Sequence, residues 1–225
     1  MTGIRELANF ITQLKLEDVP QNVQNSVKLH VLDSIGAALG ASGDELVRHV
    51  EQTYFKVAGD SQAASCWGQN KKVPLLTAIF LNAMMGHRLE LDDVHTKSKT
   101  HIGTVVVQAA WSLSEYLHKT GKEFLEAVIS GYETMSRIGM GFGVSSHRNK
   151  GWHVTATAGT FGAAAAAAKL LKLDEDKTVS ALGMAGTQSF GLWAFLNDGA
   201  SCKILHPARA AASGTEAALL SYSGM

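Results

Sequence analysis

The sequence predicts an all-α fold, arranged as one helical domain over residues 1–225. Three observations lead to this prediction. Apolar residues recur with the period of an amphipathic helix almost everywhere in the chain. An alternating, strand-like pattern occurs only in a short piece at residues 63–67. There are only three prolines, and we find no linker, repeat or low-complexity tract beyond the alanine run at 163–168.

The first two predicted helices follow from their apolar faces. The residues that mark the first face are Ile4, Leu7, Ile11 and Leu14. A second helix begins after Asp18 and Pro20, because proline is favoured at a helix start. The residues that mark its face are Val23, Val27, Val31, Ile35 and Leu39.

The later helices have clearer start signals. Thr120 and Glu123 have the spacing of a capping box, which opens a helix that extends to about residue 137. An alanine-rich helix follows at 154–171, Asp174 caps the next one, and 208–220 is a further helical segment. Glycine costs about 1 kcal/mol inside a helix, so glycines in the alanine-rich helix indicate close helix crossing or backbone that lines a pocket. The whole pattern predicts eight to ten helices.

Composition limits the functional class. A hydrophobic fraction of 46% and a charged fraction of 18% are typical of a soluble globular protein with a large core. A net charge of zero gives no overall attraction to nucleic acid or anionic membranes, so we expect neither as a partner. The most apolar window, 154–171, is interrupted by threonines and Lys169, which favours a buried helix over a membrane span. The N-terminus lacks a secretory signal pattern, and Cys66 and Cys202 lack metal-ligand spacing, so we expect a cytoplasmic protein.

Three short stretches place acid–base or cationic side chains beside small residues. They are residues 91–101, 151–157 and 202–206. Neither a dinucleotide fingerprint nor a phosphate-binding loop accompanies them. Carboxylates, imidazoles and an ammonium group without such motifs favour proton abstraction next to a carboxylate over redox or phosphoryl-transfer chemistry.

These stretches and their connecting segments resemble the MmgE/PrpD family. The similar segments are Leu-Glu-Leu-Asp-Asp-Val-His (89–95), Gly-Tyr-Glu (131–133) with Arg137-Ile138-Gly139, Gly-Trp-His (151–153), Thr-Phe-Gly-Ala-Ala-Ala (160–165), and Lys203 with His206, Arg209-Ala210-Ala211 and Ser213-Gly214. The family includes 2-methylcitrate dehydratase, cis-aconitate decarboxylase and iminodisuccinate epimerase. The resemblance implies a helical domain with an inserted α/β lid, and we expect the lid and the closing helices to lie outside this chain. It also implies a homodimer and chemistry without a metal or another cofactor.

The first stretch contributes two predicted catalytic residues, Asp93 and His101, to which the family's active-site loop points. Asp92 and His95 are predicted to help bind the substrate. One of two adjacent acids can serve the site while the other orients a histidine. The alternatives are a capped helix end with exposed charges, and a metal site in which carboxylate and imidazole act as ligands. Without a His-x-x-x-His or Cys-x-x-Cys pair, we expect no metal.

The other two stretches complete the predicted site. His153, at the start of the alanine-rich helix, and Lys203 are predicted to be catalytic, and His206 to bind substrate. Lys203 and His206 lie one helical turn apart, and a helix N-terminus attracts anions. The alternatives are a histidine packed by its neighbouring tryptophan and a surface lysine beside a capping histidine. The remaining histidines, which are His30, His49, His87, His118 and His147, have no partner pattern and are expected to be structural or exposed.

The predicted function is a lyase, either a dehydratase or a decarboxylase, that acts on a small di- or tricarboxylic acid. An isomerase or epimerase that uses the same carbanion is the first alternative, because both chemistries need the same base and anion-binding groups. A non-catalytic helical remnant or oligomerisation module is the second. If the site is shared, Asp93, His101, His153 and Lys203 should converge on one cleft.

Overall fold

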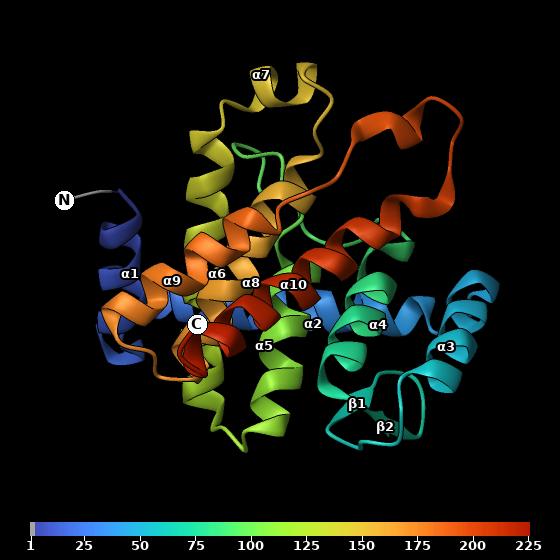
Figure 1. Ribbon diagram of the computed structural model, residues 1–225, viewed down its shortest axis with the longest axis horizontal. Helices are drawn as coiled ribbons and strands as arrows, with labels where there is room; N and C mark the ends of the chain where they lie inside the picture. Colours follow the sequence, from blue (N-terminus) through green and yellow to red (C-terminus); the bar gives the residue numbers. More distant parts are fainter. Residues whose placement is uncertain (1–2) are drawn as a thin grey trace.

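The computed structural model describes residues 3–225 and confirms the all-α prediction. The helices are α1 (Gly3–Gln13), α2 (Gln21–Ala41), α3 (Glu45–Val57), α4 (Leu75–Arg88), α5 (Gly103–Tyr116), α6 (Gly121–Gly141), α7 (Val144–Asn149), α8 (Val154–Leu170), α9 (Glu175–Thr187) and α10 (Leu205–Tyr222). Three short 3-10 turns are η1 (Leu16–Asp18), η2 (Trp193–Leu196) and η3 (Ser201–Ile204). Figure 1 shows these elements in chain order.

The extended piece predicted at residues 63–67 is one strand of a small hairpin. Strand β1 (Ala64–Cys66) pairs antiparallel with β2 (Lys71–Val73), and Ala64 lies opposite Val73. The hairpin packs against α4 and α5. Among the described residues these are the only strands that form a sheet.

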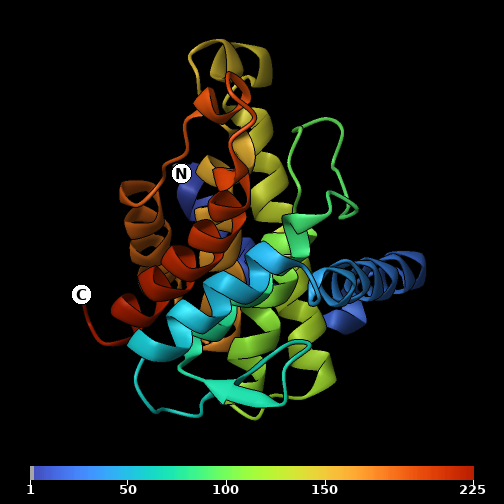
Figure 2. The same ribbon diagram turned by 90° about the vertical axis from the view of Figure 1, so that its right-hand side faces the viewer.

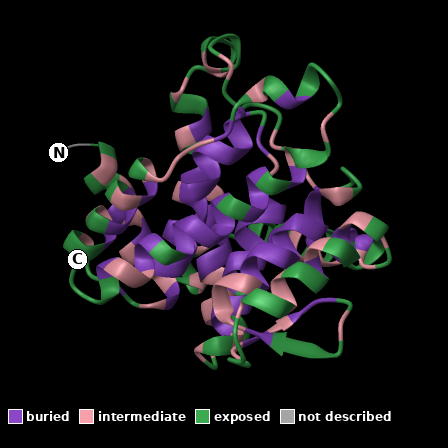
Figure 3. Ribbon diagram, turned by 45° about the vertical axis from the view of Figure 1, so that its right-hand side comes forward, coloured by how far each residue is buried: buried purple, intermediate pink, exposed green. Residues whose placement is uncertain are grey.

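Helix α8 lies at the centre of the molecule and packs most extensively against α6 and α10. All of its alanines and glycines are buried, so the expected buried helix is confirmed, and Figure 3 shows buried backbone at the centre of the molecule. Small residues allow neighbouring helix axes to approach closely: a Cβ atom on Gly162 would lie 2.8 Å from Cβ of Met135 in α6. The close helix crossing predicted from the glycines is therefore present.

The predicted helix starts agree with the structure. The Thr120 hydroxyl accepts a hydrogen bond from the Glu123 backbone N–H, and the Glu123 carboxylate accepts one from the Thr120 N–H. Asp174 caps α9 by accepting a hydrogen bond from the Lys177 N–H. The predicted face of α2 is only partly buried: Val27 is 7% exposed but Leu39 is 47% exposed. Residues four apart drift by about 40° each time around a helix of 3.6 residues per turn, so the stripe leaves the core.

The segments that carry the predicted site lie at one end of the helix bundle. These are the loop after α4, the segment around α7 that leads into α8, and the loop that leads into α10. The views in Figures 1 and 2 agree on this arrangement. Across residues 3–225, no helix combines the length and hydropathy needed to cross a membrane.

Two glycine substitutions should change stability in opposite directions. A Cβ on Gly214 in α10 would collide with the Thr160 carbonyl oxygen and lie 2.7 Å from Cβ of Ala163, whereas one on Gly183 in α9 would meet no atom within 4 Å. We predict that Gly214→Ala lowers the free energy of unfolding by about 1–3 kcal/mol through overpacking. The matched control Gly183→Ala should raise it by up to about 1 kcal/mol through helix propensity. Urea denaturation measures both, and equal effects would contradict the close crossing of α8 and α10.

Candidate active site

The candidate site is assembled from the ends of three helices. His87 lies in the last turn of α4, and the loop that follows carries Glu90, Asp92 and His101. His153 occupies the N-cap position of α8. Lys203 lies in η3, and His206 is in the first turn of α10. The functional side chains therefore lie at helix ends or on the short segments that connect them, and none lies in the middle of a helix.

Asp92 connects two histidines inside the protein. Its side chain has 0% exposure, and its Oδ2 atom lies 2.9 Å from Nδ1 of His87 and 3.2 Å from Nδ1 of His101. The His87 contact is a hydrogen bond, while the His101 contact has ion-pair distance with poorer alignment. Burial by itself raises the pKa of Asp92, but the contacts with His101 and His87 outweigh it and lower this pKa to about 2. An ionised Asp92 only accepts hydrogen bonds, so Nδ1 of His87 carries the hydrogen.

Lys203 forms an ion pair with Glu90. The Nζ atom lies 2.6 Å from Oε2 of Glu90, and the lysine side chain is 20% exposed. Burial raises the pKa of Glu90, but the hydrogen bond and the charge of Lys203 lower this pKa by more than burial raises it. The net shift of the pKa is therefore downward. The Glu90 backbone has φ of +52°, a left-handed conformation that is unfavourable for a residue with a side chain. Such backbone strain concentrates at functional sites.

His153 and His206 form a second imidazole contact. Their Nδ1 atoms lie 2.8 Å apart, and the two residues are 2% and 7% exposed. Burial lowers the pKa of His153 to about 2, with further contributions from the charges of His206, His87, Lys203 and His101. Burial likewise lowers the pKa of His206 to about 4. Both rings are therefore neutral near pH 7, and one Nδ1–H donates to the other ring's unprotonated Nδ1.

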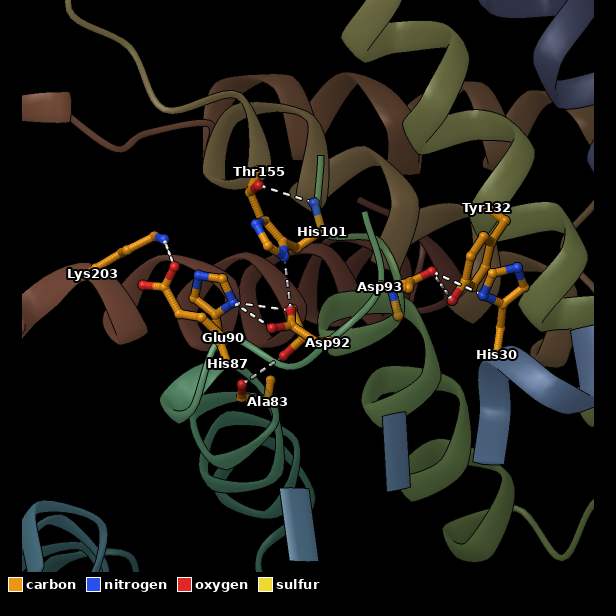
Figure 4. Close-up of polar contacts among 12 residues, drawn as sticks. His30, Ala83, His87, Glu90, Asp92, Asp93, His101, Tyr132, Thr155 and Lys203 are labelled. Atoms are coloured by element: carbon orange, nitrogen blue, oxygen red, sulfur yellow. Dashed lines mark hydrogen bonds and ion pairs between the residues drawn. The ribbon is translucent and has the colours of Figure 1, made fainter. Parts of the chain in front are cut away.

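These pairs belong to one cluster. The backbone N–H of His101 donates to the Thr155 hydroxyl at 3.2 Å, which joins the loop to the first turn of α8. The charges of His87 and Lys203 act on both His153 and His206, so all of these groups lie within electrostatic reach of one another. Figure 4 shows Lys203, Glu90, His87, Asp92, His101 and Thr155 together. The structure thus brings together His101, His153, Lys203, His206 and Asp92 from the sequence prediction.

Asp93 departs from the predicted arrangement. We expected its side chain to converge with His101, but in Figure 4 it faces His30 and Tyr132 on the other side of the loop. Its neighbour Asp92 contacts the histidines instead. The catalytic role predicted for Asp93 stays a prediction, and its contacts favour a different role.

His95 is involved in local loop contacts. Its Nδ1 lies 2.7 Å from the Ser98 hydroxyl, and its backbone N–H donates to the Thr100 carbonyl at 2.9 Å. These contacts close a tight turn within the loop. The substrate-binding role predicted for His95 also stays a prediction.

Sequence reasoning missed two members of the cluster. His87 was expected to be structural or exposed, because the sequence shows no partner pattern for it. The carboxylate five residues after it was the available signal. Glu90 was part of the quoted Leu-Glu-Leu-Asp-Asp segment, but no local pattern distinguishes it. Its partner Lys203 lies on a distant segment of the chain.

A metal ion is chemically conceivable at His87, Asp92 and His101, whose ligand atoms lie within 4.8 Å of one another. Two imidazoles and a carboxylate form a common ligand set. In the structure the same atoms contact each other directly, which satisfies Asp92 without a metal. The donor set is thus compatible with a metal, and metal-free chemistry stays a prediction.

The comparisons with known proteins agree with the resemblance read from the sequence. A family model described as the MmgE/PrpD N-terminal domain matches residues 5–225. The cis-aconitate decarboxylase-like protein oryM of Aspergillus oryzae is 33% identical over 97% of this chain and 46% of its own length. Cis-aconitate decarboxylases of Aspergillus terreus and Homo sapiens are 32% and 30% identical, each over 97% of this chain and 45% and 46% of their own lengths. The chain thus spans about half the length of the curated relatives it matches.

The neutral His153–His206 pair predicts acid sensitivity. The unfolded chain takes up protons on histidines as the pH falls through about 6.5, whereas the folded state resists protonation down to about pH 4 at His206 and about pH 2 at His153. The unfolded state therefore binds more protons in this window. As the pH decreases, the free energy of unfolding decreases by on the order of 1 kcal/mol per pH unit for each histidine.

We predict that His206→Gln reduces the slope of unfolding free energy between pH 7 and pH 5, as measured by urea denaturation. His49→Gln, a substitution of an exposed histidine in α3, is the control and should keep the wild-type slope. Parallel slopes for wild type and His206→Gln would contradict the neutral buried pair.

Proposed function

This chain belongs to the MmgE/PrpD family, and from that premise we propose that it provides half of the active site of a lyase for small tricarboxylic acids. Decarboxylation of cis-aconitate, the reaction named for the relatives, is the specific activity that we propose. Cis-aconitate carries three carboxylates, and the site offers Lys203 together with several imidazoles as partners for negative charge. The whole enzyme's activity requires the part of the relatives' length that this chain does not span.

The observation that carries the proposal is the shared electrostatic environment of Lys203, His101 and His153. One partly buried cation and several neutral or Asp-supported imidazoles gather where these segments meet. Such preorganised donors are strongest where water is excluded, because the local dielectric is low. A site of this kind stabilises negative charge that develops next to a carboxylate.

In the proposed reaction the bond between a substrate carbon and one carboxylate carbon breaks, and carbon dioxide leaves. The electron pair stays on the substrate carbon and spreads into the adjacent carboxylate, which Lys203 and His153 bind. A proton from an imidazole then adds to carbon, and solvent returns that proton to the imidazole. His101, which Asp92 orients through Nδ1, is the proposed proton donor.

Glu90 controls Lys203 in this scheme. Its carboxylate lies 2.6 Å from the ammonium group and forms an ion pair with it. A substrate carboxylate competes for the same ammonium, and Glu90 then lies beside the bound acid where it can accept a proton. This gives Glu90 a role in the site that the sequence prediction did not include.

The same groups support two neighbouring reactions. A dehydratase, such as one specific for 2-methylcitrate, would remove a proton and expel a hydroxyl group, and an epimerase would return the proton to the opposite face. A non-catalytic helical module is the alternative from another class, and the coherent cluster of buried ionisable groups argues against it. Self-association as a homodimer remains a prediction, which light scattering can test.

The function is tested by an activity assay on a chimaera of this chain with the second half of a cis-aconitate decarboxylase relative, and on the chain alone. We predict carbon dioxide release from cis-aconitate by the folded chimaera, little or none by the chain alone, and no loss of activity with a chelator. Activity that disappears with chelation and returns with zinc would contradict metal-free chemistry. Deuterium exchange at the α-carbon in heavy water, without carbon dioxide release, would indicate the epimerase instead.

Binding to the chain itself tests the anion-binding role of Lys203. We predict that Lys203→Ala weakens cis-aconitate binding roughly tenfold or more, the effect of losing one charge-assisted hydrogen bond. Glu90→Gln should have the opposite effect, because it frees the ammonium group from its internal partner. Titration calorimetry measures both, and Lys56→Ala, on the exposed face of α3, is the control. Unchanged affinity in Lys203→Ala would remove Lys203 from the site.

A further inference from the structure

Asp93 contacts three separate parts of the fold, through two hydrogen bonds and one ion-pair contact. Its Oδ1 accepts from the backbone N–H of Gly103 at 2.8 Å. Its Oδ2 accepts from the Tyr132 hydroxyl at 2.9 Å and lies 3.2 Å from Nδ1 of His30. These partners belong to α5, α6 and α2 respectively. A single side chain therefore ties the loop after α4 to three helices.

The hydrogen bond to Gly103 closes the neck of this loop. Asp93 stands near the beginning of the segment and Gly103 immediately after its end, with His101 two residues before Gly103. Asp92, on the other side of the neck, holds His101 through its carboxylate. Adjacent aspartates thus act on opposite faces, and Figure 4 shows the two groups separately.

The packing around the neck leaves no room for a side chain at Gly103. A Cβ atom on Gly103 would collide with the Ser34 hydroxyl, and it would lie 2.7 Å from Oδ1 of Asp93 and 2.8 Å from the Tyr132 hydroxyl. Only glycine fits there. The rings of His30 and Tyr132 also contact each other, with centroids 5.4 Å apart. Such a confined arrangement can hold the loop in one geometry.

We propose that Asp93 and Tyr132 are positioning residues, which lock the neck of the loop and thereby hold His101 and Asp92 in place for the reaction. The catalytic consequence rests on the proposed function, whereas the locking of the loop does not. Tyr132 contacts Asp93 and acts on His101 only through the loop. A hydrogen bond to an ionised carboxylate is among the stronger ones in proteins, so its loss should loosen the neck measurably.

The loop itself provides a reporter, because Lys97 and Lys99 are exposed within it and are trypsin sites. Brief digestion of the native chain followed by mass spectrometry gives the cleavage rate at these two lysines. We expect Tyr132→Phe to raise that rate roughly tenfold, the factor for one charge-assisted hydrogen bond. Tyr116→Phe, at an exposed position of α5, is the matched control and should behave as wild type. Equal rates in the two variants would overturn the proposal.

Two further measurements separate a locked neck from general destabilisation. With Asp93→Asn already present, adding Tyr132→Phe should change the cleavage rate much less than it does alone, because the shared hydrogen bond is already weakened. In addition, the imidazole NMR signals of His101 should shift in Tyr132→Phe at a temperature where urea denaturation shows the chain fully folded. Additive rates, or an unmoved His101 signal, would overturn the proposal.

The outcome is distinguishable from that of the proposed function, because neither digestion nor NMR requires catalysis. A loosened loop in a chain that neither binds nor decarboxylates cis-aconitate would support the locked neck and contradict the function. In an active chimaera, Tyr132→Phe should lower the turnover rate, while the reaction product should be the same as in the wild type. If the Tyr132→Phe chimaera has both the turnover and the cleavage rate of the wild type, the positioning role is contradicted and the proposed function is not.

Discussion

A carboxylate without any exposed surface must be compensated inside the protein, and Asp92 is compensated by two imidazoles. His87 is fixed by the last turn of α4, so Asp92 has little freedom, and His101 must come to the same place. The rings of His87 and His101 then contact each other edge to face, with their centroids 4.6 Å apart. The position of His101 beside α8 depends on this requirement, and the contacts of Asp93 fix the neck of the same loop.

Helix packing carries the constraint to the rest of the site. Alanine and glycine in α8 let α10 approach closely, and the ends of these two helices place His153 and His206 at 2.8 Å from each other. The small residues of α8 therefore have two effects. They allow a dense core, and they bring polar groups on distant segments together. The same burial keeps both imidazoles neutral near pH 7, so the ring that accepts the Nδ1–Nδ1 hydrogen bond carries its own hydrogen on Nε2 and can donate it to an anion.

Much of this architecture could be predicted from the sequence. Helical periodicity gave the elements, the Thr120–Glu123 capping box gave a helix boundary, and the family resemblance pointed to His153 and Lys203. The sequence could not decide which of two adjacent aspartates faces the histidines, because loop torsions settle that. It could not identify His87 either, since a buried histidine in an apolar helix has the pattern of a core residue. Glu90 depends on a partner that is remote in the chain.

The claim that these histidines form one site can be tested by histidine NMR during a titration with cis-aconitate. Ring signals of ¹⁵N-labelled histidine, assigned with His→Gln variants, should move for His101, His153 and His206 with a single shared dissociation constant. The signals of His49 and His118, which are not part of the cluster, should stay in place. A single anion-binding site would be contradicted if the signals of the three histidines saturate at different concentrations. It would also be contradicted if these signals stay in place while that of His49 moves.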